Sequence, residues 1–146
     1  MAEARASRGL LDTSVLIDLE EVGAGSLPEE FAISAVTLAE LATGPHATTD
    51  PAERASRQDR LQRTEATFDP LPVDIEVARA YGRVYCAVQQ AGRKARGRAF
   101  DLLIAATALA ADLPLYTCDP DDFRGLGGLV EIVQVERRRV GGSSSL

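Results

Sequence analysis

Apolar residues change their spacing close to the start of the chain. Residues 10–11 end a short apolar run typical of a buried strand, while the apolar residues in 15–19 follow the spacing of a helix's inner face. An acid, Asp12, stands where the spacing changes. We therefore expect a strand that ends at Leu11, a helix directly after it, and Asp12 at the carboxyl end of the strand.

Similar alternations of apolar runs and helical patterns continue to the last quarter of the chain. Further strands are predicted at 31–34, 71–73, 113–117 and 129–135. Helices are predicted between Ser34 and Gly44, from Pro51 to about Phe68, from Asp74 through Val88, and from Arg98 to Asp112. The first three of them have Ser34, Asp50 and Asp74 as N-caps. Because strands alternate with helices, we expect an α/β fold with a mostly parallel sheet of about five strands.

The position of Asp12 makes it a candidate site residue. In open parallel α/β sheets, ligands bind outside the carboxyl ends of the strands. A simpler alternative is that Asp12, Thr13 or Ser14 only caps the following helix, as all three residue types do well. The first strand alone leaves both interpretations open.

Asp101 is the acid that is hardest to explain as structural. It lies in the first turn of a helix, Arg98–Asp112, that is apolar almost all round and is therefore expected to be buried. An ionised carboxylate buried without a partner costs several kcal/mol or more, whereas a helix N-terminus offsets only about 1 kcal/mol. Asp101 thus needs a cation, strong donors or a water-filled cleft beside it.

Two more acids have comparable positions. Glu40 is the one acid of an apolar helix, and Asp119 follows the strand at 113–117. Glu40 could instead face solvent, and a turn rich in Asp and Pro would explain Asp121 and its neighbours. The alternation of strands and helices can bring Asp12, Glu40, Asp101 and Asp119 to one edge of the sheet. Such acids repel one another by about 4 kcal/mol per pair. Bound Mg²⁺ or Mn²⁺, which prefer oxygen ligands, would remove that cost.

Composition narrows the class of protein without deciding its function. The chain has 146 residues, is 45% hydrophobic and carries a formal net charge of −6, which suits one soluble domain and argues against binding a polyanion over the whole surface. Its basic residues are clustered at 54–63, 93–98 and 137–139. No apolar run is long enough to span a bilayer and no secretory signal follows Met1. The two cysteines, Cys86 and Cys118, fit inert thiols in a reducing cytoplasm.

Four segments together resemble PIN-domain ribonucleases, in particular VapC-type toxins of bacterial toxin-antitoxin pairs. They are LLDTSVLIDL with Asp12, ISAVTLAELATG with Glu40, RAFDLLIAATALAADLPLYT with Asp101, and TCDPDDF with Asp119 and Asp122. The resemblance implies a PIN-like α/β/α sandwich over residues 1–136. The tail after it, 137–146, is basic and then rich in Gly and Ser, so we expect it to be disordered. The resemblance also implies Mg²⁺-dependent endonucleolytic cleavage of RNA, a small antitoxin protein as partner, and a homodimer.

The same resemblance assigns roles to the candidate residues. Asp12, Glu40, Asp101 and Asp119 would be the metal-site acids, Thr13 and Thr117 supporting hydroxyls, and Asp122 a residue that shares or replaces the role of Asp119. A metal-activated water would then leave a 5′-phosphate and a 3′-hydroxyl. Arg98, one helical turn before Asp101, is either a phosphate clamp or a surface arginine.

Other functions fit the sequence less well. A phosphatase that uses Asp12 as nucleophile would require a second acid at position 14, which is Ser14. A phosphoacceptor receiver module would require a lysine on a late strand, but the single lysine, Lys94, lies in a predicted basic turn. A catalytically silent PIN-fold module that binds RNA or forms a complex is the remaining alternative.

Overall fold

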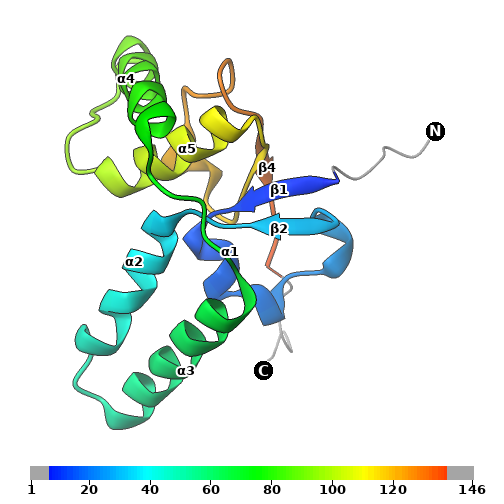
Figure 1. Ribbon diagram of the computed structural model, residues 1–146. Helices are drawn as coiled ribbons and strands as arrows, with labels where there is room; N and C mark the ends of the chain where they lie inside the picture. The colour runs from blue at the N-terminus through cyan, green and yellow to red at the C-terminus, as the bar shows by residue number, and fades with distance from the viewer. Residues whose placement is uncertain (1–6, 138–146) are drawn as a thin grey trace, which may run out of the picture.

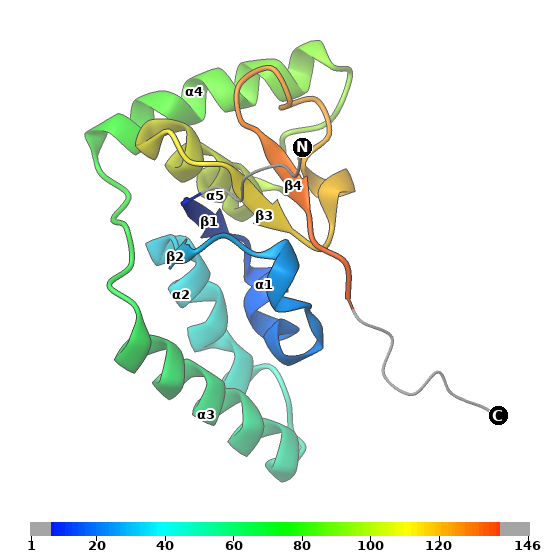
Figure 2. The same ribbon diagram turned by 90° about the vertical axis from the view of Figure 1, so that its right-hand side faces the viewer.

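Parallel strands form the centre of the computed structural model, which describes residues 7–137. They are β1 (Arg8–Leu11), β2 (Glu30–Ala32), β3 (Leu115–Thr117) and β4 (Ile132–Gln134), in the spatial order β2-β1-β3-β4. The pairings of β1 with β2, β1 with β3, and β3 with β4 are all parallel. The carboxyl ends of the strands therefore share one edge of the sheet (Figure 2).

The helices begin where the predicted caps stand. They are α1 (Thr13–Ile17), α2 (Ala35–Thr43), α3 (Pro51–Thr67), α4 (Ile75–Gln90) and α5 (Ala99–Ala111), with short 3-10 turns at η1 (Leu19–Glu21), η2 (Ala24–Ser26), η3 (Gly44–His46) and η4 (Pro120–Phe123). Ser34 Oγ accepts a hydrogen bond from the backbone N–H of Val36 at 3.0 Å. The carboxylates of Asp50 and Asp74 cap α3 and α4 in the same way.

The sheet separates two apolar layers, which confirms the predicted α/β/α sandwich. Neighbouring residues of β1 point to opposite faces. Leu10 packs in a cluster with Val84 of α4 and Leu102 of α5, while Leu11 packs with Val15 of α1. All five side chains are fully buried. Figure 1 shows α4 and α5 on one side of the strands and α1 on the other.

Of the five predicted strands, the one at 71–73 is reduced to a single β-bridge between Leu71 and Ser34. Leu71 donates its N–H to the carbonyl of Ile33 at 2.9 Å and accepts from the N–H of Ala35 at 2.8 Å. Prolines at 70 and 72 flank it, and a proline has no N–H with which to extend a ladder. Within residues 7–137 the sheet therefore has four strands rather than about five.

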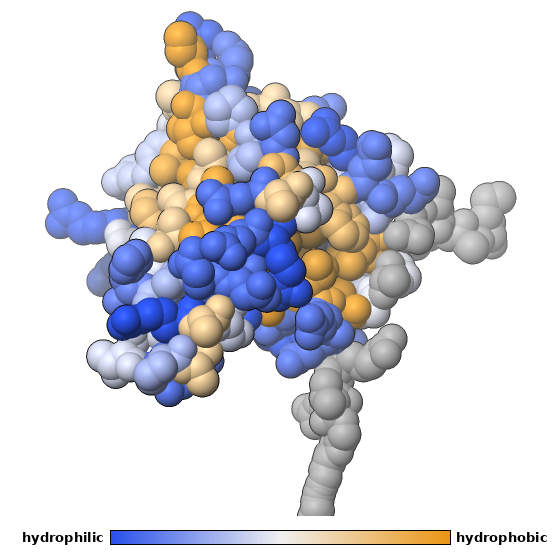
Figure 3. Space-filling model, turned by 60° about the horizontal axis from the view of Figure 1, so that its bottom comes forward, coloured by the Kyte–Doolittle hydropathy of each residue, from blue (hydrophilic) through white to orange (hydrophobic). Residues whose placement is uncertain are grey.

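The outer surface also agrees with the polar pattern of the sequence. Helix α3 is polar, and the face that Figure 3 brings forward is largely hydrophilic with an apolar patch beside it. No helix within 7–137 has the length and apolar character to cross a bilayer. Of the predicted tail, 137–146, all but Arg137 lies outside the described residues.

Candidate acidic site at the carboxyl edge of the sheet

Asp12 is buried and held by hydroxyl groups. It stands at the N-cap position of α1, yet its side chain makes no capping hydrogen bond. The residue is 5% exposed, and its Oδ2 accepts hydrogen bonds from Ser14 Oγ at 2.8 Å and Thr117 Oγ1 at 2.9 Å. Burial raises the pKa of Asp12, and the two hydroxyl donors partly offset this effect. The capping interpretation of this carboxylate is therefore wrong.

Glu40 faces the same edge from α2. It is half-buried, and its Oε1 accepts a hydrogen bond from Thr13 Oγ1 at 2.5 Å. Thr13 Oγ1 also lies 3.1 Å from the buried hydroxyl of Thr37. Burial raises the pKa of Glu40, and the charge of Asp12 raises it further. Glu40 is thus not an ordinary solvent-facing residue of an apolar helix.

Asp101 is the acid on which the other charges act most strongly. It lies half-buried in the first turn of α5. Burial, followed by the charges of Asp122, Asp12 and Glu40, raises the pKa of Asp101 to about 6, while Arg98 lowers it. Asp12 after β1, Glu40 of α2, Asp101 of α5 and Asp122 of η4 therefore interact electrostatically. Asp119, predicted as the fourth acid, is not among the charges that act on Asp101.

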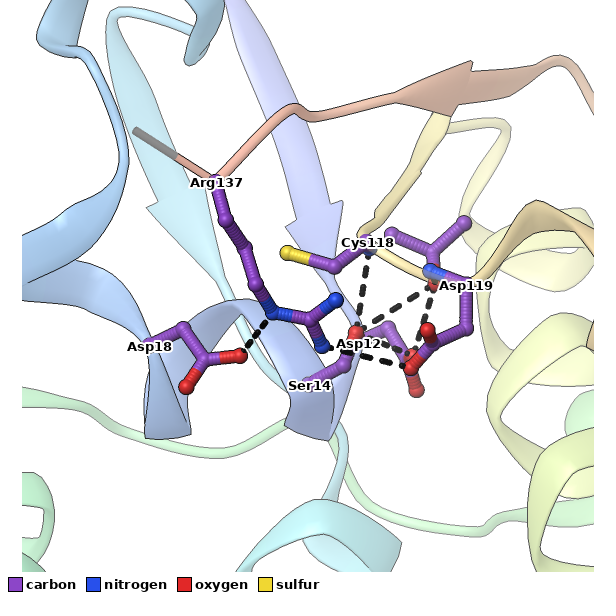
Figure 4. Close-up of polar contacts among 7 residues, drawn as sticks. Asp12, Ser14, Asp18, Cys118, Asp119 and Arg137 are labelled. Atoms are coloured by element: carbon purple, nitrogen blue, oxygen red, sulfur yellow. Dashed lines mark hydrogen bonds and ion pairs between the residues drawn. The ribbon is translucent and has the colours of Figure 1, made fainter. Parts of the chain in front are cut away.

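The two acids of the TCDPDDF segment have different surroundings. The charge of Asp122 raises the pKa of both Asp12 and Asp101. Asp119 donates its backbone N–H to Thr117 Oγ1 at 2.9 Å, but its Oδ2 lies 3.6 Å from Nη2 of Arg137 (Figure 4). Asp122 thus acts on the centre of the acid group, whereas Asp119 is paired with a cation at its margin.

The arginine predicted as a phosphate clamp has a local partner. Arg98 donates from Nη1 to the backbone carbonyl of Asp122 at 3.2 Å. Arg93 similarly donates to the carbonyl of Asp121 at 2.6 Å. Both arginines hold η4 against the start of α5, so they position Asp122. Whether Arg98 also contacts phosphate stays a prediction.

Sequence reasoning missed three residues of this edge. Ser14 was considered only as a cap, although its Oγ also accepts the N–H of Cys118 at 3.1 Å. Thr37 was not singled out, and Arg137 was assigned to the tail. Arg137 lies beyond the carboxyl end of β4, as Asp12 lies beyond that of β1. This placement after a strand is the signal that could have identified it.

The donor set suits a hard cation that keeps much of its water. The polar groups in contact at this edge are carboxylates and hydroxyls. Within 7–137, no three acidic, His or Cys side chains are gathered closely enough to hold an ion by themselves. Mg²⁺ commonly binds one or two carboxylates and completes its shell with water and substrate phosphate. The residues present therefore fit such an ion and do not form a closed protein cage.

A groove of about 490 Å³ is lined by Asp18, which pairs with Arg137, but not by Asp12, Glu40 or Asp101. It runs between the end of α1, η1, β2 and α3, and its apolar wall consists of Leu16, Ile17, Leu19, Phe31 and Phe68. Ile17 is 46% exposed and Phe31 is 37% exposed. Charged and hydroxyl side chains of η1 and α3 complete the lining, so the groove presents exposed apolar side chains within a polar surround.

Comparison with known proteins assigns the family. The family model described as PIN domain matches residues 9–129. The chain belongs to the PIN-domain family. Ribonuclease VapC5 of Mycobacterium tuberculosis (strain ATCC 25618 / H37Rv) is 39% identical to this PIN domain over 132 residues, which cover 87% of the chain and 95% of the relative.

Solved structures agree with this assignment. The crystal structure of VapBC-5 from Mycobacterium tuberculosis, a member of the VapBC family of toxin-antitoxin systems, matches this PIN domain with a TM-score of 0.78 and 38% identity. The match covers 88% of this chain and 98% of the solved chain. FitAcB from Neisseria gonorrhoeae has a TM-score of 0.69 and 27% identity, with coverages of 86% and 96%. The likeness to VapC-type proteins predicted from the four segments is confirmed.

Proposed function

We propose that this PIN domain is a metal-dependent endoribonuclease, the toxin of a type II toxin-antitoxin pair. The observation that carries the proposal is that the charges of Asp12, Glu40 and Asp122 all act on half-buried Asp101 at the carboxyl edge of the sheet. The negative charges of these acids repel one another and lower the stability of the folded protein, whereas a bound cation would relieve that repulsion. The resemblance to a protein named Ribonuclease VapC5 supports RNA as the substrate.

Asp12 and Asp101 would hold Mg²⁺, with Mn²⁺ as a possible substitute. When bound, the cation supplies charge neutralisation at the phosphate and lowers the pKa of a water molecule. Ser14 and Thr117 fix the orientation of the Asp12 carboxylate through their hydrogen bonds. Asp122 is held in place by Arg98, just before α5, and its neighbour Asp121 by Arg93, and the charge of Asp122 favours cation binding.

Glu40 would orient the attacking water and accept its proton. Burial raises the pKa of this carboxyl, which favours proton uptake. The Thr13 hydroxyl keeps Glu40 in place. Water attack on phosphorus breaks the bond to the 3′ oxygen, which takes up a proton, so the products are a 5′-phosphate and a 3′-hydroxyl.

A protein antitoxin is the partner we propose. The solved relative is a member of the VapBC family of toxin-antitoxin systems. This chain offers a groove in which Ile17 and Phe31 are exposed and whose wall includes Asp18, the partner of Arg137. Exposed apolar strips with a polar rim are typical of surfaces that protein partners cover. A small antitoxin bound there could reach the acids and block access of RNA.

The first test is cleavage of structured RNA by Asp101→Asn. We expect the activity of the variant in Mg²⁺ to fall at least about 100-fold, and chelation with EDTA to abolish the activity of the unmodified protein. Asp121→Asn is the matched control, because Asp121 is an exposed acid on the same side of the molecule, paired with Arg124. Circular dichroism verifies that both variants are folded.

Two results would contradict the proposal. One is normal cleavage by folded Asp101→Asn. The other is an unmodified protein that binds RNA without cutting it in Mg²⁺ or Mn²⁺, which would support the catalytically silent RNA-binding module instead.

A further inference from the structure

The segment after β4 holds Arg137 in a defined position at the acidic edge. Val135 donates its N–H to the carbonyl of Thr117 at 2.8 Å, and Arg137 forms an antiparallel bridge with Val22, at the end of η1. Val135 and Val22 are both buried. The backbone that leads to Arg137 is thus held by Thr117, and Arg137 itself is paired with Val22, so its side chain starts from a defined point.

One guanidinium meets two carboxylates there. Arg137 donates from Nε to Oδ2 of Asp18 at the end of α1, and its Nη2 lies 3.6 Å from Oδ2 of Asp119 (Figure 4). The Asp18 side chain is 21% exposed, and the Arg137 side chain 43%. Asp18 therefore anchors the guanidinium through Nε, and the terminal nitrogen Nη2 of the same planar group reaches Asp119.

Asp119 is connected to the centre of the site through its backbone. Its N–H is bonded to Thr117 Oγ1, which donates to the carboxylate of Asp12. Within residues 7–137, the pair with Arg137 is also the one ion pair formed by any of the candidate site acids. The charge of Asp119 is thus compensated by the protein, while those of Asp12, Glu40, Asp101 and Asp122 are not compensated by ion pairs.

We propose that Arg137 is a positioning residue that holds the Asp119 carboxylate at the margin of the site and competes for it with the divalent cation. This inference rests on the proposed metal-dependent function. A carboxylate that is paired with a guanidinium must leave it before it can bind a cation, so the ion pair lowers the affinity of the site. Arg137 thereby sets how much negative charge is offered to the cation.

The test is Mn²⁺ binding to the RNA-free protein, measured by isothermal titration calorimetry. Arg137→Gln should bind Mn²⁺ about three- to fivefold more tightly, which corresponds to the usual strength of an exposed ion pair. In an Asp119→Asn background, the same substitution should leave the Kd unchanged, because the carboxylate that Arg137 holds is gone.

Arg124→Gln is the matched control. Arg124 follows η4 and pairs with Asp121, so its removal changes the net charge equally without freeing Asp119. We expect its Kd for Mn²⁺ to stay within about twofold of that of the unmodified protein. If Arg137→Gln does not fold, Arg137→Lys replaces it. Lysine lacks the planar fork with which Arg137 contacts both acids from separate nitrogens, so this variant should also bind Mn²⁺ more tightly.

The outcomes separate the inference from the proposed function. An unchanged Kd in folded Arg137→Gln overturns the inference, as does equal tightening in the Asp119→Asn background or in Arg124→Gln, either of which would show an effect of net charge alone. If the unmodified protein binds no Mn²⁺, the proposed metal-dependent function fails together with the inference. If it binds Mn²⁺ and Arg137 has no effect, only the inference fails.

Discussion

Single residues at the acidic edge differ in how their negative charge is compensated. Asp12 is stabilised by two hydroxyl donors and Glu40 by one, whereas Asp119 has a guanidinium. Within residues 7–137, the Asp101 carboxylate has neither a hydroxyl donor nor a guanidinium beside it in a hydrogen bond or ion pair, and the charges of three other acids act on it. Asp101 is thus the residue at which removal of a charge has the clearest effect on stability.

We predict that Asp101→Asn stabilises the metal-free protein, and more so at pH 7.5 than at pH 5. Folding raises the pKa of Asp101 from its ordinary value of 3.8 to about 6, so the folded state binds this proton more tightly than the unfolded chain does. The resulting stability is fully present below pH 3.8 and is lost as the pH rises through about 6. Thermal unfolding in EDTA at both pH values measures the effect.

Asp121→Asn serves as the control for this pH series, since Asp121 is exposed and paired with Arg124. A gain in melting temperature for Asp101→Asn that is equal at the two pH values, or larger at pH 5, would show that the carboxyl is not held at a raised pKa in the folded protein.

Among the secondary-structure elements, α3 shows how a basic sequence cluster can serve packing. Arg54 donates to the carbonyls of Pro45 and Thr48 at 3.0 and 2.9 Å, and Arg57 donates to the carbonyl of Gly44 at 3.0 Å. These carbonyls belong to the turn after α2, where a helix end leaves acceptors unsatisfied. Two of the four arginines of α3 therefore tie this helix to the turn after α2, which agrees with an outer layer better than with an RNA-binding surface.

Arg57→Gln should lower the free energy of unfolding by about 1 kcal/mol, because it removes a hydrogen bond to a helix-end carbonyl and an ion pair with Glu53. Arg60→Gln, one turn further along α3, should change it by less than about 0.5 kcal/mol. Urea unfolding followed by circular dichroism compares the two. Equal losses for both variants would contradict the packing role.

For the whole molecule, the acidic edge and the groove between α1 and α3 are connected through one ion-pair network. Asp18 lines the groove and also anchors Arg137, which reaches Asp119. A partner seated in the groove would therefore touch the residue that fixes the margin of the site. Other large apolar side chains, including Ile75 at 69% and Phe100 at 50% exposure, remain open elsewhere on the surface, and such residues are candidates for burial in an oligomer.

We predict a homodimer in the absence of a partner, as the resemblance to VapC-type toxins implies. Multi-angle light scattering at micromolar concentration should give twice the mass of one chain, and the mass should fall on dilution if the interface is small. A single-chain mass over the whole concentration range would contradict the dimer without affecting the proposed activity.

Much of this protein could be predicted from its sequence. The caps at Ser34, Asp50 and Asp74, the alternation of strands with helices, and the acids Asp12 and Asp101 at a strand end and a helix start depend on residues close together in the chain. Local periodicity and capping therefore determined them. The missing strand at 71–73 has a local cause as well, because Pro70 and Pro72 could have excluded it.

Only the tertiary structure decided how the charges are distributed. Asp119 and Asp122 stand three residues apart, yet one pairs with Arg137 and the other acts on Asp101. Arg54 and Arg57 bind backbone carbonyls, which their spacing on a helix could not reveal. Electrostatic interaction and hydrogen bonding depend on distances across the fold and on burial, and neither quantity can be read from residue order.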